Sequence, residues 1–143
     1  MEGVTKRDPR GQGDRGEILA AMWFAERGAT VFTPFFHTSP HVDFMVEWEG
    51  VVERIQVKTT TQFRLKRWEV ALCTRGGNQS WNGTVKRLDR TRYDKLFVVV
   101  GDGRRWLIPS HEVSGGSGMR LGGPKYEGFE LEPGPPLVLS LRR

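Results

Sequence analysis

Apolar residues follow a helical period near the start of the chain and a strand period after it. In RGEILAAMWFAERG, the apolar residues at helical spacing are Ile18, Leu19, Met22 and Ala25. Gly28 follows as a stop signal, so the pattern predicts a helix over about residues 15–27. Apolar and polar residues then alternate in VDFMVEWEG, and VVERIQVKTT resumes after Glu49-Gly50. These two segments predict a β-hairpin with a tight turn between them.

The rest of the chain predicts more strands and little helix. ATVFTPFF and RWEVALC are typical of strands, LFVVVGDGRRWLIP of a second hairpin, and KYEGFELE of a last strand. VKRLDRTRYDK is expected to be irregular or a short helix, and Ser110 to cap a helical turn that runs through Val113. A helix followed by hairpins predicts an α/β (α+β) fold with a mixed, largely antiparallel sheet. We expect one domain over residues 14–132, between a flexible segment at 1–13 and an extended tail at 133–143.

Composition narrows the class of protein. The chain has 143 residues and a single cysteine, which excludes an internal disulfide and favours a reducing cytoplasm. Its longest apolar runs are too short to span a bilayer, and its N-terminal segment lacks the apolar stretch of a signal peptide, so no membrane partner is expected. The net charge of +5 favours a polyanion such as nucleic acid, although a mild excess of this kind also serves solubility.

The segment RIQVKTT carries polar side chains where a buried strand is expected. Gln56 and Lys58 are two residues apart, so they share one face of the strand. A hairpin that turns at Glu49-Gly50 pairs Asp43 with Gln56. A carboxylate, an amide and an ammonium group in one place are costly unless they serve one another or an ion. Carboxylate and amide oxygens suit Mg²⁺, and the ammonium of Lys58 suits a phosphate ester, so these residues predict a phosphodiester site.

The order of three short motifs resembles a nuclease superfamily. GDRGE lies in the predicted helix, PHVDF opens the hairpin, IQVKTT lies on its return strand, and WNGT, YDKLFVVV and WLIP follow. This order resembles the PD-(D/E)XK superfamily, and within it the small prokaryotic members of homing-endonuclease and Holliday-junction-resolvase type. The likeness spans about residues 12–112 and rests on the order and spacing of the motifs. It implies a restriction-endonuclease-like core with helical elements on its flanks.

The resemblance also implies a metal-dependent DNA endonuclease and gives each matching residue a role. Asp43 corresponds to the central metal ligand, Glu17 to a carboxylate that reaches in from the helix, and Lys58 to the lysine of the motif. The Val57 carbonyl corresponds to a main-chain ligand. Gln56 stands where the second acid normally stands, as in some branches of the superfamily, and its neutral amide should weaken Mg²⁺ binding. The implied cofactor is Mg²⁺, or Mn²⁺ in its place. The implied partners are branched or double-stranded DNA and a second copy of the chain, in a homodimer or a larger homo-oligomer.

Basic residues gather in the region that follows. Residues 73–95 contain six basic and two acidic residues, and the candidates for DNA contacts are Arg75, Lys86, Arg87, Arg90 and Arg92. Trp81 and Tyr93 lie among them, and aromatic rings beside cations suit phosphate contacts and base stacking. The same pattern is equally typical of a solvated loop whose aromatic rings dock on the core.

Ordinary structural roles also fit the candidate residues. Lys58 is then an edge-strand lysine that prevents aggregation, and Glu17 a first-turn acid favoured by the helix dipole. His37 and His41 are four residues apart, but their proline-containing segment predicts a loop and not a zinc-binding helix. Cys73 is expected to be a small buried residue.

Two further functions compete with the nuclease. The first is a non-catalytic nucleic-acid-binding module on the same scaffold, which the neutral Gln56 favours. The second is a protein-interaction domain, in which the apolar segment PLVLSL near the C-terminus is the candidate for pairing between subunits.

Overall fold

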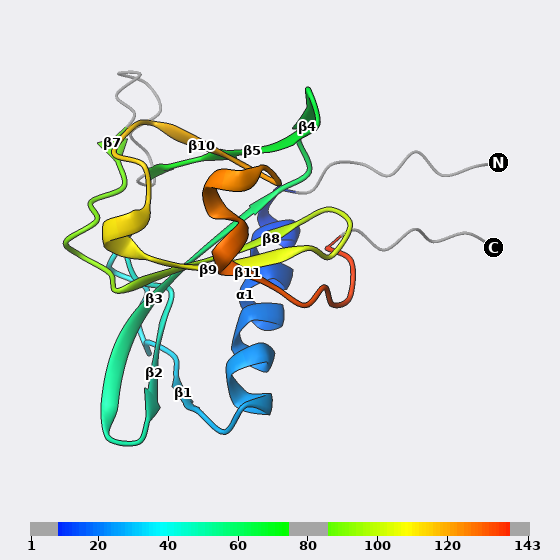
Figure 1. Ribbon diagram of the computed structural model, residues 1–143. Helices are drawn as coiled ribbons and strands as arrows, with labels where there is room; N and C mark the ends of the chain where they lie inside the picture. The colour runs from blue at the N-terminus through cyan, green and yellow to red at the C-terminus, as the bar shows by residue number, and fades with distance from the viewer. Residues whose placement is uncertain (1–8, 75–85, 138–143) are drawn as a thin grey trace, which may run out of the picture.

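The computed structural model describes residues 9–74 and 86–137. In this part of the chain, one long helix packs on one face of a six-stranded sheet, and a smaller sheet lies on the other side (Figure 1). This is the mixed, largely antiparallel α+β architecture that the pattern predicts. The strands of the large sheet, in spatial order, are β1 (Thr30–Phe32), β2 (Phe44–Trp48), β3 (Val51–Thr60), β8 (Lys95–Val100), β9 (Arg105–Pro109) and β11 (Glu130–Leu131).

The helix α1 (Pro9–Glu26) starts earlier than the pattern predicted. Residues 9–13, which the sequence placed in a flexible N-terminal segment, belong to it. The reason is tertiary, because Gln12 Nε2 donates to Thr59 Oγ1 at 3.1 Å and ties this first part of the helix to β3. The helix ends at Glu26, close to the predicted end, and Gly28 follows with a φ of 90° that suits a glycine-terminated C-cap.

The β2–β3 hairpin has the predicted turn and register. Glu49 and Gly50 both have positive φ, 52° and 81°, as a two-residue hairpin turn requires. Phe44 pairs with Ile55, which places Asp43 opposite Gln56 at the next position. On its other side β3 pairs with β8 in parallel, so β3 is a central strand and the edge-strand interpretation of Lys58 was wrong.

The smaller sheet and the short helices cover the other face. This sheet runs in the order β10 (Gly118–Leu121), β5 (Arg67–Ala71) and β4 (Phe63–Arg64), and a two-stranded ribbon joins β6 (Cys73–Thr74) to β7 (Lys86–Arg87). The 3-10 helices are η2 (Ser110–Glu112) and η3 (Pro124–Phe129). Two predictions were wrong in this region. KYEGFELE is mostly η3, with only the short β11 at its end, and Ser110 makes no side-chain cap.

Two hydrophobic cores lie on opposite faces of the large sheet. One forms between α1 and the sheet, and the other between the sheet and β5, β10 and η3. The helix does not bury the face that its spacing suggested, because Ile18 and Met22 are exposed by 60% and 49%. Of the residues at that spacing, Leu19 is buried, and Ala20 and Phe24 are buried beside it. ILAAMWFA is apolar on every side of a helix, so its periodicity could not select the face.

Small residues let α1 lie close to β3. A Cβ atom added at Gly16 would overlap the Thr59 side chain. This close approach matters for function, because Gly16 precedes Glu17 and its contact with β3 sets how far the Glu17 side chain reaches toward the sheet.

Candidate active site

Asp43 lies just before β2 and continues the strand ladder with its side chain. Its main-chain N–H donates to Ile55 O at 2.8 Å, and its Oδ2 accepts from the Val57 N–H at 2.6 Å. The carboxylate therefore takes the place of the next strand residue. This confirms the predicted neighbourhood of Asp43 with the middle of β3.

Glu17 reaches the same place from α1. Its carboxyl group is hydrogen-bonded to Asp43, and its pKa is raised to about 7 by burial, by the charge of Asp43 and by that hydrogen bond. Burial also raises the pKa of Asp43, against the opposing effects of the Val57 N–H, the Glu17 hydrogen bond and the charges of Lys58 and His37. Glu17 therefore holds the proton that the pair shares. Two carboxyl groups this close favour either a proton or a cation between them.

Gln56 and Val57 supply further oxygen atoms beside this pair. A strand residue directs its N–H and C=O to the same edge, so the Val57 carbonyl faces the side on which Asp43 lies. It accepts a hydrogen bond from Gln56 Nε2 at 3.1 Å. Gln56 is only 4% exposed, and no residue in the described part of the chain donates a hydrogen bond to its buried Oε1. A buried amide oxygen without a partner costs on the order of 1–3 kcal/mol, which a ligand at that oxygen would recover.

Lys58 lies on the same face of β3 as Gln56 and is largely enclosed. Its Nζ donates to Cys73 O at 2.8 Å. Burial lowers the pKa of Lys58, and the negative charge of Asp43 opposes that shift. Cys73 itself is only partly buried, so the prediction of a buried thiol was wrong, and its carbonyl is the group that contacts the site.

His37 and His41 lie in the β1–β2 loop beside the site, but in the described part of the chain they do not belong to one set of metal ligands. His41 Nδ1 accepts from the Asp89 N–H at 3.3 Å, which leaves the proton of the neutral ring on Nε2. Burial lowers the pKa of His41, and the charges of Arg92 and Lys58 lower it further. Among the described residues, no group of three or more His, Cys, Asp or Glu side chains is arranged to hold a metal. Any metal here would therefore depend on Gln56 and on main-chain oxygen in addition to the two acids.

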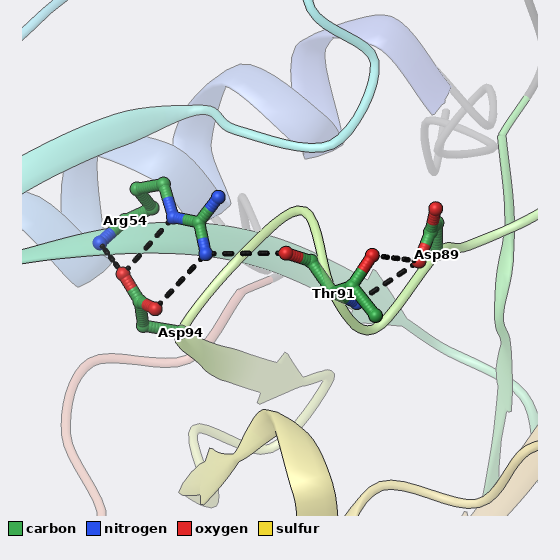
Figure 2. Close-up of polar contacts among 4 residues, drawn as sticks. All are labelled: Arg54, Asp89, Thr91 and Asp94. Atoms are coloured by element: carbon green, nitrogen blue, oxygen red, sulfur yellow. Dashed lines mark hydrogen bonds and ion pairs between the residues drawn. The ribbon is translucent and has the colours of Figure 1, made fainter.

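A polar cluster that the sequence did not reveal fixes the loop before β8. Arg54 N and Nε donate to Asp94 Oδ2 at 2.7 and 3.1 Å, and Nη2 donates to Asp94 Oδ1 at 3.1 Å and to Thr91 O at 3.2 Å (Figure 2). Asp89 Oδ1 in turn accepts from the N–H and the hydroxyl of Thr91, at 2.9 and 2.7 Å. These contacts hold residues 89–94 against β3, two residues before Gln56.

The predicted DNA-contacting residues fall into three groups. Arg75 and the side chain of Lys86 lie outside the part that the structure describes. Arg87 and Arg92 are exposed and available to a ligand. Arg90 donates to Val113 O at 2.7 Å, which gives it a structural contact. Tyr93 is 1% exposed and belongs to the core, so it does not stack on bases.

The raised pKa of Glu17 predicts an unusual pH dependence of stability. The folded protein holds this proton up to about pH 7, whereas the carboxyl has an ordinary value of 4.5. Stability from this group is therefore complete below pH 4.5 and is lost as the pH rises through about 7. We expect Glu17→Gln to remove most of this slope and to raise the free energy of unfolding at pH 8 by about 1–2 kcal/mol, after discounting for partial exposure. Urea denaturation in EDTA from pH 4 to 8 measures both, and equal slopes in the two proteins would contradict it.

Comparison with known proteins adds one finding. No protein-family model and no curated protein matches the sequence. The fold is similar to that of a bacterial homing endonuclease. This solved structure, I-Ssp6803I, aligns with a TM-score of 0.69 over 90% of this chain and 89% of that chain, at 19% sequence identity. At this identity the likeness shows the fold alone, and it agrees with the predicted α+β architecture of an N-terminal helix and a mixed, largely antiparallel sheet.

The described helices also bear on the membrane question. None of them, α1 included, combines the length and the apolar character that crossing a bilayer requires.

Proposed function

We propose that the chain is a metal-dependent DNA endonuclease of PD-(D/E)XK type, with Gln56 in place of the second acid. The observation that carries this proposal is the hydrogen-bonded pair of Glu17 and Asp43, at the side of a central strand that also presents Gln56 and Lys58. Two neighbouring carboxyl groups, an unpartnered amide oxygen and an enclosed lysine destabilise a fold that has no ligand to bind there. The similarity in fold to a homing endonuclease supports the same conclusion.

The residues present fit Mg²⁺, which prefers oxygen ligands and binds through one or two carboxylates together with waters and phosphates. Asp43, Val57 O and Gln56 Oε1 would hold it, with Glu17 as a further carboxylate. Rotation of the Gln56 amide exchanges its nitrogen and its oxygen, so the same side chain can satisfy Val57 O without metal and serve as a ligand with it. When bound, the ion supplies a water of lowered pKa and stabilises charge on the phosphate.

The chain's own side chains would complete the reaction site. Lys58 offers a positive charge to the phosphate, and its lowered pKa makes the neutral amine more accessible for taking a proton from water. Glu17, which holds a proton up to about pH 7, would release it when a cation replaces that proton. Arg87 and Arg92 are exposed cations that suit the DNA backbone. Because a duplex has two strands to cut, we expect a homodimer or a larger homo-oligomer. The single cysteine favours a reducing cytoplasm as its location.

The alternative is a nucleic-acid-binding module without catalysis. One observation favours it. Main-chain carbonyl groups already accept hydrogen bonds from both Gln56 Nε2 and Lys58 Nζ. With neutral Gln56 in place of an acid, the site has one negative charge fewer and is stable without metal. This alternative predicts salt-dependent DNA binding and no effect of divalent ions.

The two functions are separated by incubating supercoiled plasmid DNA with the purified protein. We expect nicked and linear products with Mg²⁺ or Mn²⁺ and none with EDTA. Lys58→Met should lower the rate by at least about a hundredfold, which is a typical loss for one group that assists proton transfer. Lys66→Met, in the β4–β5 turn, is the matched control and should cleave normally. Binding without cleavage under all metal conditions would leave the binding module as the function.

A further inference from the structure

A pocket adjoins the candidate active site and has no role in it. It has a volume of about 290 Å³ and lies between the β1–β2 loop and the strands β1 to β3. Phe32, Met45 and Arg54, which are paired across the three strands, form its floor. The β1–β2 loop supplies most of the remaining lining, including Phe36, His37 and Val42.

The pocket and the site share a border. Val42 lines the pocket and is followed in the chain by Asp43. Arg54 lines it from β3, two residues before Gln56 and on the same face of that strand. His37 also lines it, and its charge acts on the Asp43 carboxyl group. The pocket therefore lies beside the place where the proposed function puts a phosphate, at Asp43.

The lining has the character of a site for a flat, mostly apolar group with polar edges. Its walls are aromatic and aliphatic, and hydroxyl groups come from Thr33, Thr38 and Ser39. Among the described residues that line it, none is acidic, so nothing there repels a polyanion. Phe36 is 73% exposed although it lies on a folded loop, and it packs edge-to-face on the 91% exposed Phe35 with ring centroids 4.9 Å apart. An aromatic face held open to solvent in this way suits stacking.

We propose that this pocket takes a nucleobase, unstacked from the DNA strand whose phosphate lies at Asp43, with Phe36 as its stacking partner. The inference rests on the proposed function and names its substrate class, which is DNA with an unpaired or easily unstacked base beside the cleaved bond. Extruding a base from a paired duplex costs several kcal/mol, and an already unpaired base avoids most of that cost. The protein therefore binds DNA with such a base more tightly than fully paired DNA.

The test is the affinity for two short duplexes that differ by one unpaired adenine, measured by fluorescence anisotropy with Ca²⁺ in place of Mg²⁺. We expect the bulged duplex to bind about tenfold more tightly to the wild-type protein, which is about 1.4 kcal/mol. Phe36→Ala should bind both duplexes alike, and Phe36→Tyr should keep the preference because it keeps the ring. Phe63→Ala is the matched control, since it removes a 55% exposed ring from the smaller sheet.

A second measurement needs no variant. With 5-iodouracil as the unpaired base, irradiation should cross-link the wild-type protein within residues 32–45 or at Arg54, which together line the pocket. A cross-link elsewhere, or equal binding of both duplexes by a protein that cleaves DNA with Mg²⁺, would overturn the nucleobase proposal. The proposed nuclease function would then be unaffected. A protein that neither binds nor cleaves DNA removes both proposals. If Phe36→Ala loses the preference while sedimentation shows a dimer becoming a monomer, the ring serves a second copy of the chain and the nucleobase proposal is overturned.

Discussion

Asp43→Asn is expected to lower the rate of Mg²⁺-dependent DNA cleavage by at least about a thousandfold, which corresponds to about 4 kcal/mol of activation free energy. Asp43 supplies the carboxylate that lies nearest to the Val57 main chain and the Glu17 side chain. An asparagine keeps an oxygen that can accept from the Val57 N–H, so the strand ladder is retained. It removes the negative charge that would bind a divalent ion.

The same variant should be more stable than the wild-type protein at neutral pH and above. Its neutral amide no longer repels Glu17, whose raised pKa reports that repulsion together with burial. A gain in thermal stability in EDTA combined with the loss of cleavage would show that the pair is kept for function and at a cost to folding. Thermal unfolding and plasmid cleavage on the same preparations measure the two effects. Asp43→Asn protein that cleaves at the wild-type rate would rule out Asp43 as a metal ligand.

The hairpin was predictable because local chemistry determines it. Glu49-Gly50 selects a two-residue turn, and the alternation of apolar residues on both sides leaves a single register that buries Phe44 and Ile55. That register alone placed Asp43 beside Gln56. The order of the motifs then brought Glu17 into the same site, and the structure places it there against Asp43.

Other features depended on contacts between distant segments and left no local signal. The parallel pairing of β3 with β8 makes Lys58 central, and its enclosure depends on the carbonyl of Cys73 from β6. Arg54 and Asp94 are 40 residues apart, and nothing near either residue indicates their ion pair. The exposed face of α1 could not be predicted either, because its segment ILAAMWFA is apolar on every side. The proximity of Glu17, Asp43 and Gln56 could therefore be predicted from the sequence, whereas the contacts that enclose Lys58 and fix Arg54 could not.

Gln56→Glu is expected to make the metal-free protein less stable and to increase the stabilisation that a bound divalent ion provides. Position 56 is 4% exposed and lies next to Asp43 in the hairpin register. A third carboxyl group there is buried beside two others, so in EDTA at pH 8 the free energy of unfolding should fall by about 3–5 kcal/mol. A divalent ion should recover most of that loss, because the added carboxylate is a negatively charged oxygen ligand and should raise Mg²⁺ affinity by at least about tenfold.

The measurement is thermal unfolding of the wild-type protein, Gln56→Glu and Gln56→Met, each in EDTA and in a Mg²⁺ series. Methionine matches the volume of glutamine without an oxygen, so Gln56→Met should be close to the wild-type protein in EDTA and should gain least from Mg²⁺. The expected order of Mg²⁺ stabilisation is Gln56→Glu, then the wild-type protein, then Gln56→Met. If Mg²⁺ leaves all three midpoints unchanged, the unpartnered Gln56 oxygen binds no cation, and the non-catalytic module becomes the better explanation of this fold.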